Sequence, residues 1–546
     1  MSSRPFDKVV CIGLDGATFD IIDPMVRRGR LPTLAGLLEE GTRAQLRSTV
    51  PALSAPAWVS FMTGMNPGRH GVFQFRTMSQ GVLGSDLVGS WMYRGRTIFD
   101  DASRNDLRVG AFRVPMTYPP WPVNGIMLSG FPTPDPRRNF SEPREVGENL
   151  PALGRLAPLK SMTAGIDAQI DNFDYFVDRS TEALIEVLGA HEFDLFCYVN
   201  SITDWAAHKF WRYSDPSAPG YEPYGVDGVT PLEHFYERAD ESLGKVLEAT
   251  ADSALVIVLS DHGTGPRSPR RFDTDAWLAD LGLLTMRTPR PWRGLAASAV
   301  DRAKDVMPRK YWLWQHAPKS VRTSAQRLQA NGRAIEWSQS SAYGVRIDHH
   351  VEGVNVNLAG RERGGRVPAE SYEDVRARVI AASADVVDPT TGAPIIRAAH
   401  RREDLYSGDH VDAAPDVVLE LHETHEAGRV RGAPTPSNPA AFRRERSSAT
   451  HRPDGVLVIA GRGVRQGIDL GNADLLDVPA TILWALGLEI PQEMDGTVLA
   501  EAFEPAFATR HPKRAGAAAV ERAVPEGYSH EEEEQMSEHL EALGYL

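Results

Sequence analysis

The sequence predicts an α/β fold built on a doubly wound, mostly parallel sheet, and two kinds of pattern support this prediction. Near-continuous apolar runs occupy residues 9–14, 195–199 and 254–259. Runs of Val, Ile and Leu without polar alternation are typical of strands that are covered on both faces. Amphipathic helical patterns lie among these runs, and the one at 230–249 begins with Thr and Pro, which favour a first helical turn. This order of strands and helices is typical of a parallel sheet between two layers of helices.

Each of the three apolar runs is followed closely by an aspartate. Asp15, Asp204 and Asp261 follow the first, second and third run. Open α/β sheets bind ligands beyond the carboxyl ends of their strands. Because the carboxyl ends of parallel strands lie at one edge of the sheet, we expect the three carboxylates to lie close together.

The rest of the chain is expected to add an insertion and a C-terminal helix to this core. We expect residues 1–264 and 341–505 to form the core, and residues 265–340, which are rich in Arg, Trp and Pro, to form an inserted cap-like segment. Residues 506–546 are expected to form a linker and a terminal helix. In that helix Ser529 and Glu532 have capping-box spacing, and Met536, Leu540 and Leu543 share one face.

Composition excludes some classes of function. The 546 residues carry a formal net charge of −14, which disfavours nucleic-acid binding. The two cysteines, Cys11 and Cys197, lie in apolar runs and are expected to be buried thiols, as in a reducing compartment. The sequence shows neither an apolar leader nor a run of about 20 apolar residues, so we expect a cytoplasmic protein without a membrane anchor. The oligomeric state stays open.

Histidines accompany two of the three aspartates, in patterns that predict metal binding. Asp204 and His208 are four residues apart, which places them on one face of a helix. His262 follows Asp261, and His451 precedes the apolar run at 455–460. Three Asp and three His suffice for two neighbouring divalent ions. The mixture of oxygen and nitrogen ligands suits zinc, with manganese and iron as alternatives.

A serine at the start of a short predicted helix is the candidate nucleophile. Ser54 lies two residues before Pro56, and the stretch at 55–64, "APAWVSFMTG", is predicted to be a short helix that ends at Gly64. Amide groups at a helix N-terminus attract an anion. A serine hydroxyl there that binds a metal ion would be activated by coordination rather than by a neighbouring base.

Another histidine cluster, at 348–350, is interpreted differently. Asp348, His349 and His350 lie in a stretch that resembles a loop, with no predicted strand beside it. We therefore expect no site there.

Together these stretches resemble the alkaline phosphatase superfamily, and within it the type I phosphodiesterase/nucleotide pyrophosphatase branch. The similar stretches include "CIGLDGATFD", "PALSAPAWVSFMTGMNPGRHGV", "DWAAHKFW", "LSDHG" and "THRPDGVLVIAGRGV". The resemblance implies two divalent metal ions, a small-molecule phosphoester substrate and a covalent phospho-serine intermediate on Ser54. Carried over residue by residue, the ligands of one ion are Asp15, Ser54, Asp261 and His262, and those of the other are Asp204, His208 and His451.

One departure from the family pattern leaves alternatives open. Members of the nucleotide pyrophosphatase branch that this chain resembles usually have an Asn shortly after the nucleophile. This chain has Ala57 at that position, followed by Trp58. A backbone amide or Arg69 would then have to contact the phosphoryl oxygen. A phosphomonoesterase, a phosphoryl transferase and a sulfatase-like hydrolase stay as alternatives, although Trp58 replaces the Arg of the sulfatase pattern. A metal-stabilised binding protein without activity is a more distant alternative.

Overall fold

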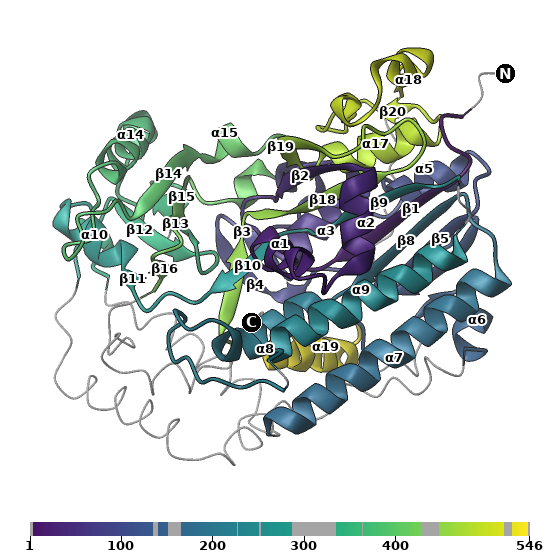
Figure 1. Cartoon of the computed structure of the whole chain (residues 1–546). Coiled ribbons are helices and arrows are strands. Elements are labelled where there is room, and N and C mark those ends of the chain that lie inside the picture. Colours follow the sequence, from purple (N-terminus) through teal and green to yellow (C-terminus); the bar gives the residue numbers. More distant parts are fainter. Residues whose placement is uncertain are drawn as a thin grey trace.

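A nine-stranded sheet runs through the centre of the computed structural model (Figure 1). The structure describes residues 4–134, 140–150, 165–226, 228–250, 253–286, 335–362, 364–428, 447–517 and 527–543. Five adjacent strands are parallel to one another, whereas β18 (Asp454–Ala460) is antiparallel to both of its neighbours and β7 (Ser141–Glu142) is antiparallel to β6 (Gly125–Ser129). This arrangement confirms the predicted mostly parallel α/β sheet. In spatial order the strands are β19 (Ile468–Asp474), β2 (Thr42–Arg47), β18 (Asp454–Ala460), β9 (Leu255–Leu259), β1 (Val9–Leu14), β8 (Leu195–Asn200), β5 (Val109–Val114), β6 (Gly125–Ser129) and β7 (Ser141–Glu142).

Helices cover both faces of this sheet, which explains the unbroken apolar runs. Every residue of β1 and β8 is buried. Alternate side chains of β1 enter two different cores, with Val9 and Cys11 in one and Val10 and Ile12 in the other. On the first face lie α3 (Ser54–Thr63), α5 (Ile98–Arg104), α17 (Asp477–Ala485) and α19 (His530–Leu543). On the second face lie α1 (Phe19–Arg27), α2 (Pro32–Glu40), α7 (Ile166–Ala190), α8 (Ile202–Ser214) and α9 (Pro231–Ala249).

A second, antiparallel sheet lies beside the first and has its own apolar cluster (Figure 1). Its order is β12 (Ala342–Arg346), β13 (Val351–Val356), β15 (Val417–Leu421) and β14 (Ile396–Arg401). It packs with α10 (Thr274–Asp280) and α14 (Tyr372–Ser383). Among the described residues these four strands form a sheet of their own, within the segment 341–505 that the sequence analysis assigned to the core. The predicted domain boundaries stay predictions, and residues 287–334 of the expected cap lie outside the described residues.

Two short ladders join the end of the central sheet to its surroundings. β10 (Gly263–Pro266) pairs with β17 (Ala449–Arg452), and β11 (Arg271–Phe272) pairs with β16 (Glu426–Ala427). The remaining elements are α4 (Pro67–His70), β3 (Arg76–Ser79), β4 (Val82–Leu87), α6 (Arg144–Glu148), α15 (Arg402–Leu405), β20 (Ile490–Pro491), α18 (Pro505–Arg510) and β21 (Ala515–Gly516).

The C-terminal helix α19 docks on the core as expected. The backbone N–H of Ser529 donates to the Glu532 carboxylate at 2.9 Å, and the backbone N–H of Glu532 donates to Ser529 Oγ at 3.4 Å, which confirms the capping box. Met536 and Leu540 are fully buried against the first face of the sheet. Within the described part of the chain, no helix is both long enough and apolar enough to cross a bilayer.

Candidate metal centre

The topology of the sheet brings the three aspartates to one edge. β1 lies between β8 and β9 and is parallel to both. Asp15 follows β1 directly, Asp261 follows β9 after one residue, and Asp204 lies in the first turn of α8, just beyond β8. The three carboxylates therefore lie close together and buried at the carboxyl ends of three adjacent strands, as the sequence analysis expected.

The first group of potential metal ligands consists of Asp204, His208 and His451, whose ligand atoms all lie within 4.8 Å of one another. Asp204 Oδ1 is 3.4 Å from His208 Nε2 and 3.6 Å from His451 Nε2. The two Nε2 atoms are 3.0 Å apart. Two imidazole nitrogens and a carboxylate oxygen that converge in this way can hold a divalent metal ion.

The second group consists of Asp15, Asp261 and His262, whose ligand atoms also lie within 4.8 Å of one another. His262 Nε2 is 3.3 Å from Asp261 Oδ2 and 3.8 Å from Asp15 Oδ1. It is also 3.1 Å from Ser54 Oγ. The rings of His262 and His451 stack with their centroids 4.0 Å apart, so the two groups are neighbours.

Ser54 is the first residue of α3 and is buried. Leu53 occupies the N-cap position and has no polar side chain that could accept from the amides of the first turn. The candidate hydroxyl, the start of a ten-residue helix and the second ligand group therefore meet at one point.

The electrostatics of this place favour bound cations. Burial raises the pKa of the Asp15 carboxyl well above its usual range, and the carboxylates of Asp261 and Asp204 raise it further. Burial and the charge of Asp204 raise the pKa of Asp261 to about 7. Burial also opposes ionisation of Asp204, but His208 and His451 outweigh it and lower the pKa of that carboxyl. Burial, followed by repulsion from His262, holds the pKa of His451 well below its ordinary value.

Two buried oxygens provide a direct test of whether metal ions fit. Asp15 Oδ1 and Asp261 Oδ2 have no hydrogen-bond partner among the described residues. A buried carboxylate oxygen without a donor is costly, and a divalent cation between such oxygens removes that cost. The second ligand group therefore fits a cation, and the converging ligand atoms of the first group fit another.

Hydrogen bonds to Nδ1 orient His262, in the bend between β9 and β10, and His208, on α8, toward the centre. His262 Nδ1 donates to the Gly263 carbonyl at 3.0 Å. Ser447 Oγ donates to the Ala449 carbonyl at 2.6 Å and therefore accepts from His208 Nδ1, which is 2.8 Å away. Both rings thus carry their proton on Nδ1 and turn a lone pair on Nε2 toward the ligand groups.

Three supporting residues were not found by sequence reasoning. The Trp58 indole donates to Asp15 Oδ2 at 3.2 Å, so the residue that interrupts the sulfatase pattern orients a carboxylate. Thr203 Oγ1 donates to the Asp15 carbonyl at 2.6 Å, and Ser447 orients His208. Trp58 lies in a quoted stretch and Thr203 directly precedes another, but neither has a chemical signature of its own, and only the tertiary contacts reveal their roles.

Two further expectations need comment. Arg69, considered as a contact for the phosphoryl oxygen, instead forms an ion pair with Asp495 at 2.9 Å. The cluster at 348–350 was expected to have no strand beside it, and this was wrong. It is the turn between β12 and β13, and Asp348 and His350 line a pocket that also contains His451. The turn was missed because β12 and β13 are short strands of the separate sheet.

A doubly wound α/β sheet with paired Asp/His groups and a helix-starting serine at its carboxyl edge defines the class of alkaline phosphatase-like phosphoester hydrolases. The chain belongs to the type I phosphodiesterase/nucleotide pyrophosphatase family, whose profile matches residues 9–432. His451 lies beyond the matched range, so its place in the centre rests on the geometry.

Comparisons with individual proteins give only distant similarities. A search of curated proteins finds no match. An inactive variant of murine ectonucleotide pyrophosphatase/phosphodiesterase 5 in complex with AMP is 12% identical with a TM-score of 0.48, over 91% of this chain and 100% of that chain. Phosphonoacetate hydrolase from Sinorhizobium meliloti in complex with phosphonoformate is 14% identical with a TM-score of 0.49, over 89% of this chain and 96% of that chain.

Proposed function

We propose that this phosphoester hydrolase cleaves phosphodiesters of small molecules, with Ser54 as the nucleophile and two zinc ions as cofactors. The observation that carries the proposal is the position of the buried Ser54 Oγ, which is 3.1 Å from Nε2 of His262 in the second ligand group. The ring of His262 in turn stacks on that of His451 in the first group. A preference for diesters over monoesters follows from the family to which the chain belongs. The buried, unbridged thiols of Cys11 and Cys197 suit a cytoplasmic location.

The seven predicted residues divide into two sets of ligands. Asp204, His208 and His451 would hold one ion, and Asp15, Asp261 and His262 would hold the other together with Ser54. Bound in this way, the two cations would lower the pKa of the serine hydroxyl and neutralise charge on the phosphoryl and leaving oxygens. Three histidine nitrogens among the ligands favour zinc over magnesium or calcium, which prefer oxygen ligands.

The chain itself supplies the nucleophile and its orientation. Ser54 releases its hydroxyl proton to solvent, and Oγ forms a bond to phosphorus while the bond from phosphorus to the leaving alcohol breaks. The departing alkoxide takes up a proton from solvent. Water then attacks phosphorus, the bond from Oγ to phosphorus breaks, and Ser54 regains its proton. The uncapped first turn of α3 lies beside the attacking oxygen and stabilises negative charge there.

Turnover of bis-p-nitrophenyl phosphate and of p-nitrophenyl phosphate, with and without a chelator, tests this function. The diester should be the better substrate, and chelation should abolish turnover until zinc is restored. Ser54→Ala should be inactive, whereas Ser338→Ala, which alters an exposed serine, should keep full activity. Full activity of the Ser54→Ala variant would rule out the covalent mechanism. Activity that survives complete metal removal would rule out the metal-dependent one.

A further inference from the structure

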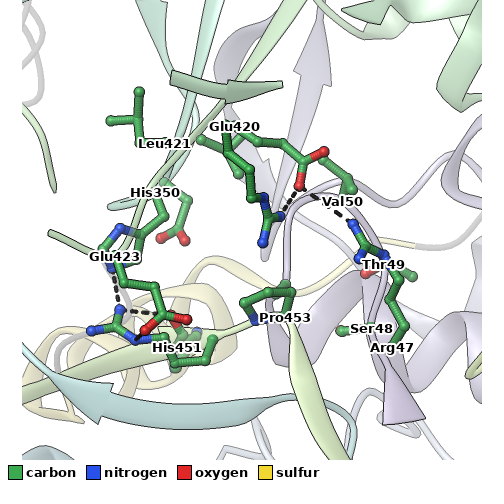
Figure 2. Close-up of a pocket in the computed structure, with 15 residues that line it drawn as sticks. Arg47, Ser48, Thr49, Val50, His350, Glu420, Leu421, Glu423, His451 and Pro453 are labelled. Carbon is green, nitrogen blue, oxygen red and sulfur yellow. Dashed lines mark hydrogen bonds and ion pairs between the residues drawn. The ribbon is translucent and has the colours of Figure 1, made fainter. Parts of the chain in front are cut away.

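A pocket between the two sheets begins at the candidate metal centre. His451 lines it, and so does the chain from Arg47 to Ala52, which leads directly into Ser54. The opposite wall is formed by the second sheet, at the turn before β13 and at the end of β15. Figure 2 shows Arg47, Ser48 and Thr49 on one side and His350 and Glu423 on the other. Through His451 the pocket therefore adjoins the centre at which a phosphoryl group bound to Ser54 would lie.

The two walls of the pocket approach each other closely. Arg47 Nη2, on the wall formed by the large sheet, is 3.8 Å from Glu420 Oε2 on the second sheet. Arg452, next to His451, donates to His350 and pairs with Glu423 at 3.2 Å. Because these contacts bridge the walls, the pocket admits a short substituent rather than a bulky one.

The charges that line the pocket balance one another. Three guanidinium groups, those of Arg47, Arg397 and Arg452, face three carboxylic acids, those of Asp348, Glu420 and Glu423. A pocket for an anion or for a cation would carry an excess of the opposite charge. Formal neutrality, with donors and acceptors side by side, instead suits a neutral group that both donates and accepts hydrogen bonds.

Some hydrogen-bonding capacity in the pocket is unused within the described part of the chain. Ser48 is only 7% exposed, and its hydroxyl has no hydrogen-bond partner there. The neighbouring Thr49 differs, because its hydroxyl donates to the Pro51 carbonyl at 2.8 Å. A buried hydroxyl without a partner costs free energy that a ligand hydroxyl would recover. The Arg47 guanidinium can also donate to a ligand, because its contact with Glu420 is long, at 3.8 Å. The Glu420 carboxylate is bound more closely by Arg397 and by His400, the latter at 2.8 Å.

Among the described residues, the pocket has no aromatic side chain on which a nucleobase could stack. Of the described residues that line it, none is Phe, Tyr or Trp. Bases are commonly held by stacking on such rings. The lining therefore favours an aliphatic polyol over a nucleoside.

We propose that this pocket selects phosphodiesters in which one alcohol is a short neutral polyol of the size of glycerol, held by Ser48 and Arg47. This inference rests on the proposed function and specifies the substrate class of the same site. The methyl, propyl, glyceryl, glycolate and choline esters of p-nitrophenyl phosphate form a matched series. Glyceryl and propyl esters differ in hydroxyl groups, and the glycolate and choline esters add a negative and a positive charge.

The glyceryl ester should exceed the propyl ester in kcat/KM by about tenfold, mainly through a lower KM, since two net hydrogen bonds contribute about this much. Ser48→Ala and Arg47→Met should each reduce that ratio to about threefold or less. The matched control is Arg108→Met, which removes an exposed arginine paired with Glu192 and should leave the ratio unchanged. The methyl substituent is too short to reach the pocket. The kcat/KM of the methyl ester therefore measures the activity of the metal centre without a contribution from the pocket.

The outcomes separate the two proposals. If no ester of the series is hydrolysed after zinc is added, the proposed function itself fails. If all are hydrolysed but the glyceryl and propyl esters have equal kcat/KM, the function stands and the polyol pocket is refuted. A glycolate or choline ester that surpasses the glyceryl ester would likewise overturn the inference, because it would show selection for charge.

Discussion

Removal of the metal ions should invert the pH dependence of stability at the candidate centre. The metal-free protein buries three carboxyl groups next to one another, and the pKa values of two of them, Asp15 and Asp261, are raised. In the metal-loaded protein the same groups are ligands, and bound cations favour their ionised form. The perturbation is therefore chelation, and the observable is the free energy of unfolding as a function of pH.

The size of the effect follows from Asp261. Its pKa is about 7 in the folded protein, compared with an ordinary value of 3.8. Between these values the folded state keeps a proton that the unfolded state has lost, so stability is full at low pH and falls as pH rises toward 7. This difference in pKa contributes about 4 kcal/mol to the free energy of unfolding at low pH. About 2 kcal/mol of that contribution is lost between pH 5.5 and pH 8. Asp15 acts in the same direction.

Urea denaturation at pH 5.5 and pH 8, with chelator or with zinc, measures this effect. The chelated protein should have the lower midpoint at pH 8, and the zinc-loaded protein should show the opposite trend. In the chelated protein, Asp261→Asn should remove much of the decrease in stability between pH 5.5 and pH 8. Asp385→Asn, at an exposed position, should leave that decrease unchanged. The reasoning would be refuted if the chelated protein were equally stable at both pH values. It would also be refuted if Asp261→Asn left the difference in midpoint between the two pH values unchanged.

The remaining predictions concern single residues of the centre. Ser54→Ala should lower kcat by at least about three orders of magnitude while zinc analysis still finds two ions per chain. His451→Ala should lose one ion and keep the other, because His451 belongs to one ligand group, and loss of both would contradict the division. Trp58→Phe removes the hydrogen bond to Asp15 and should weaken zinc binding about 10- to 100-fold in a chelator competition. Gly13→Ala would place a Cβ 2.5 Å from the Trp58 ring and should cost about 1–3 kcal/mol, seen as a lower urea midpoint.

Much of the centre could be predicted because its residues follow strands. An apolar run without alternation identifies a doubly covered strand, and the position of Asp15 directly after such a run places it at the carboxyl edge. The spacing of Asp204 and His208 adds a shared helix face. These are local signals, and they sufficed to list every residue of the two ligand groups.

Other parts of the site could not be predicted, because they depend on contacts between segments far apart in sequence. Ser447 is 239 residues from His208 and orients it through one hydrogen bond. The turn at Asp348 reaches the centre only because the second sheet packs against the first, and its short strands carry no strong pattern of their own.

The sequence by itself therefore determined the class of fold and the candidate ligands, with the candidate serine, since periodicity and strand-end position are properties of short segments. Only the tertiary structure decided how far apart the members of each group lie, which hydrogen bonds orient them, and which pocket adjoins them. Those properties depend on distances between strands, and strand order is fixed by the packing of whole layers rather than by any local pattern.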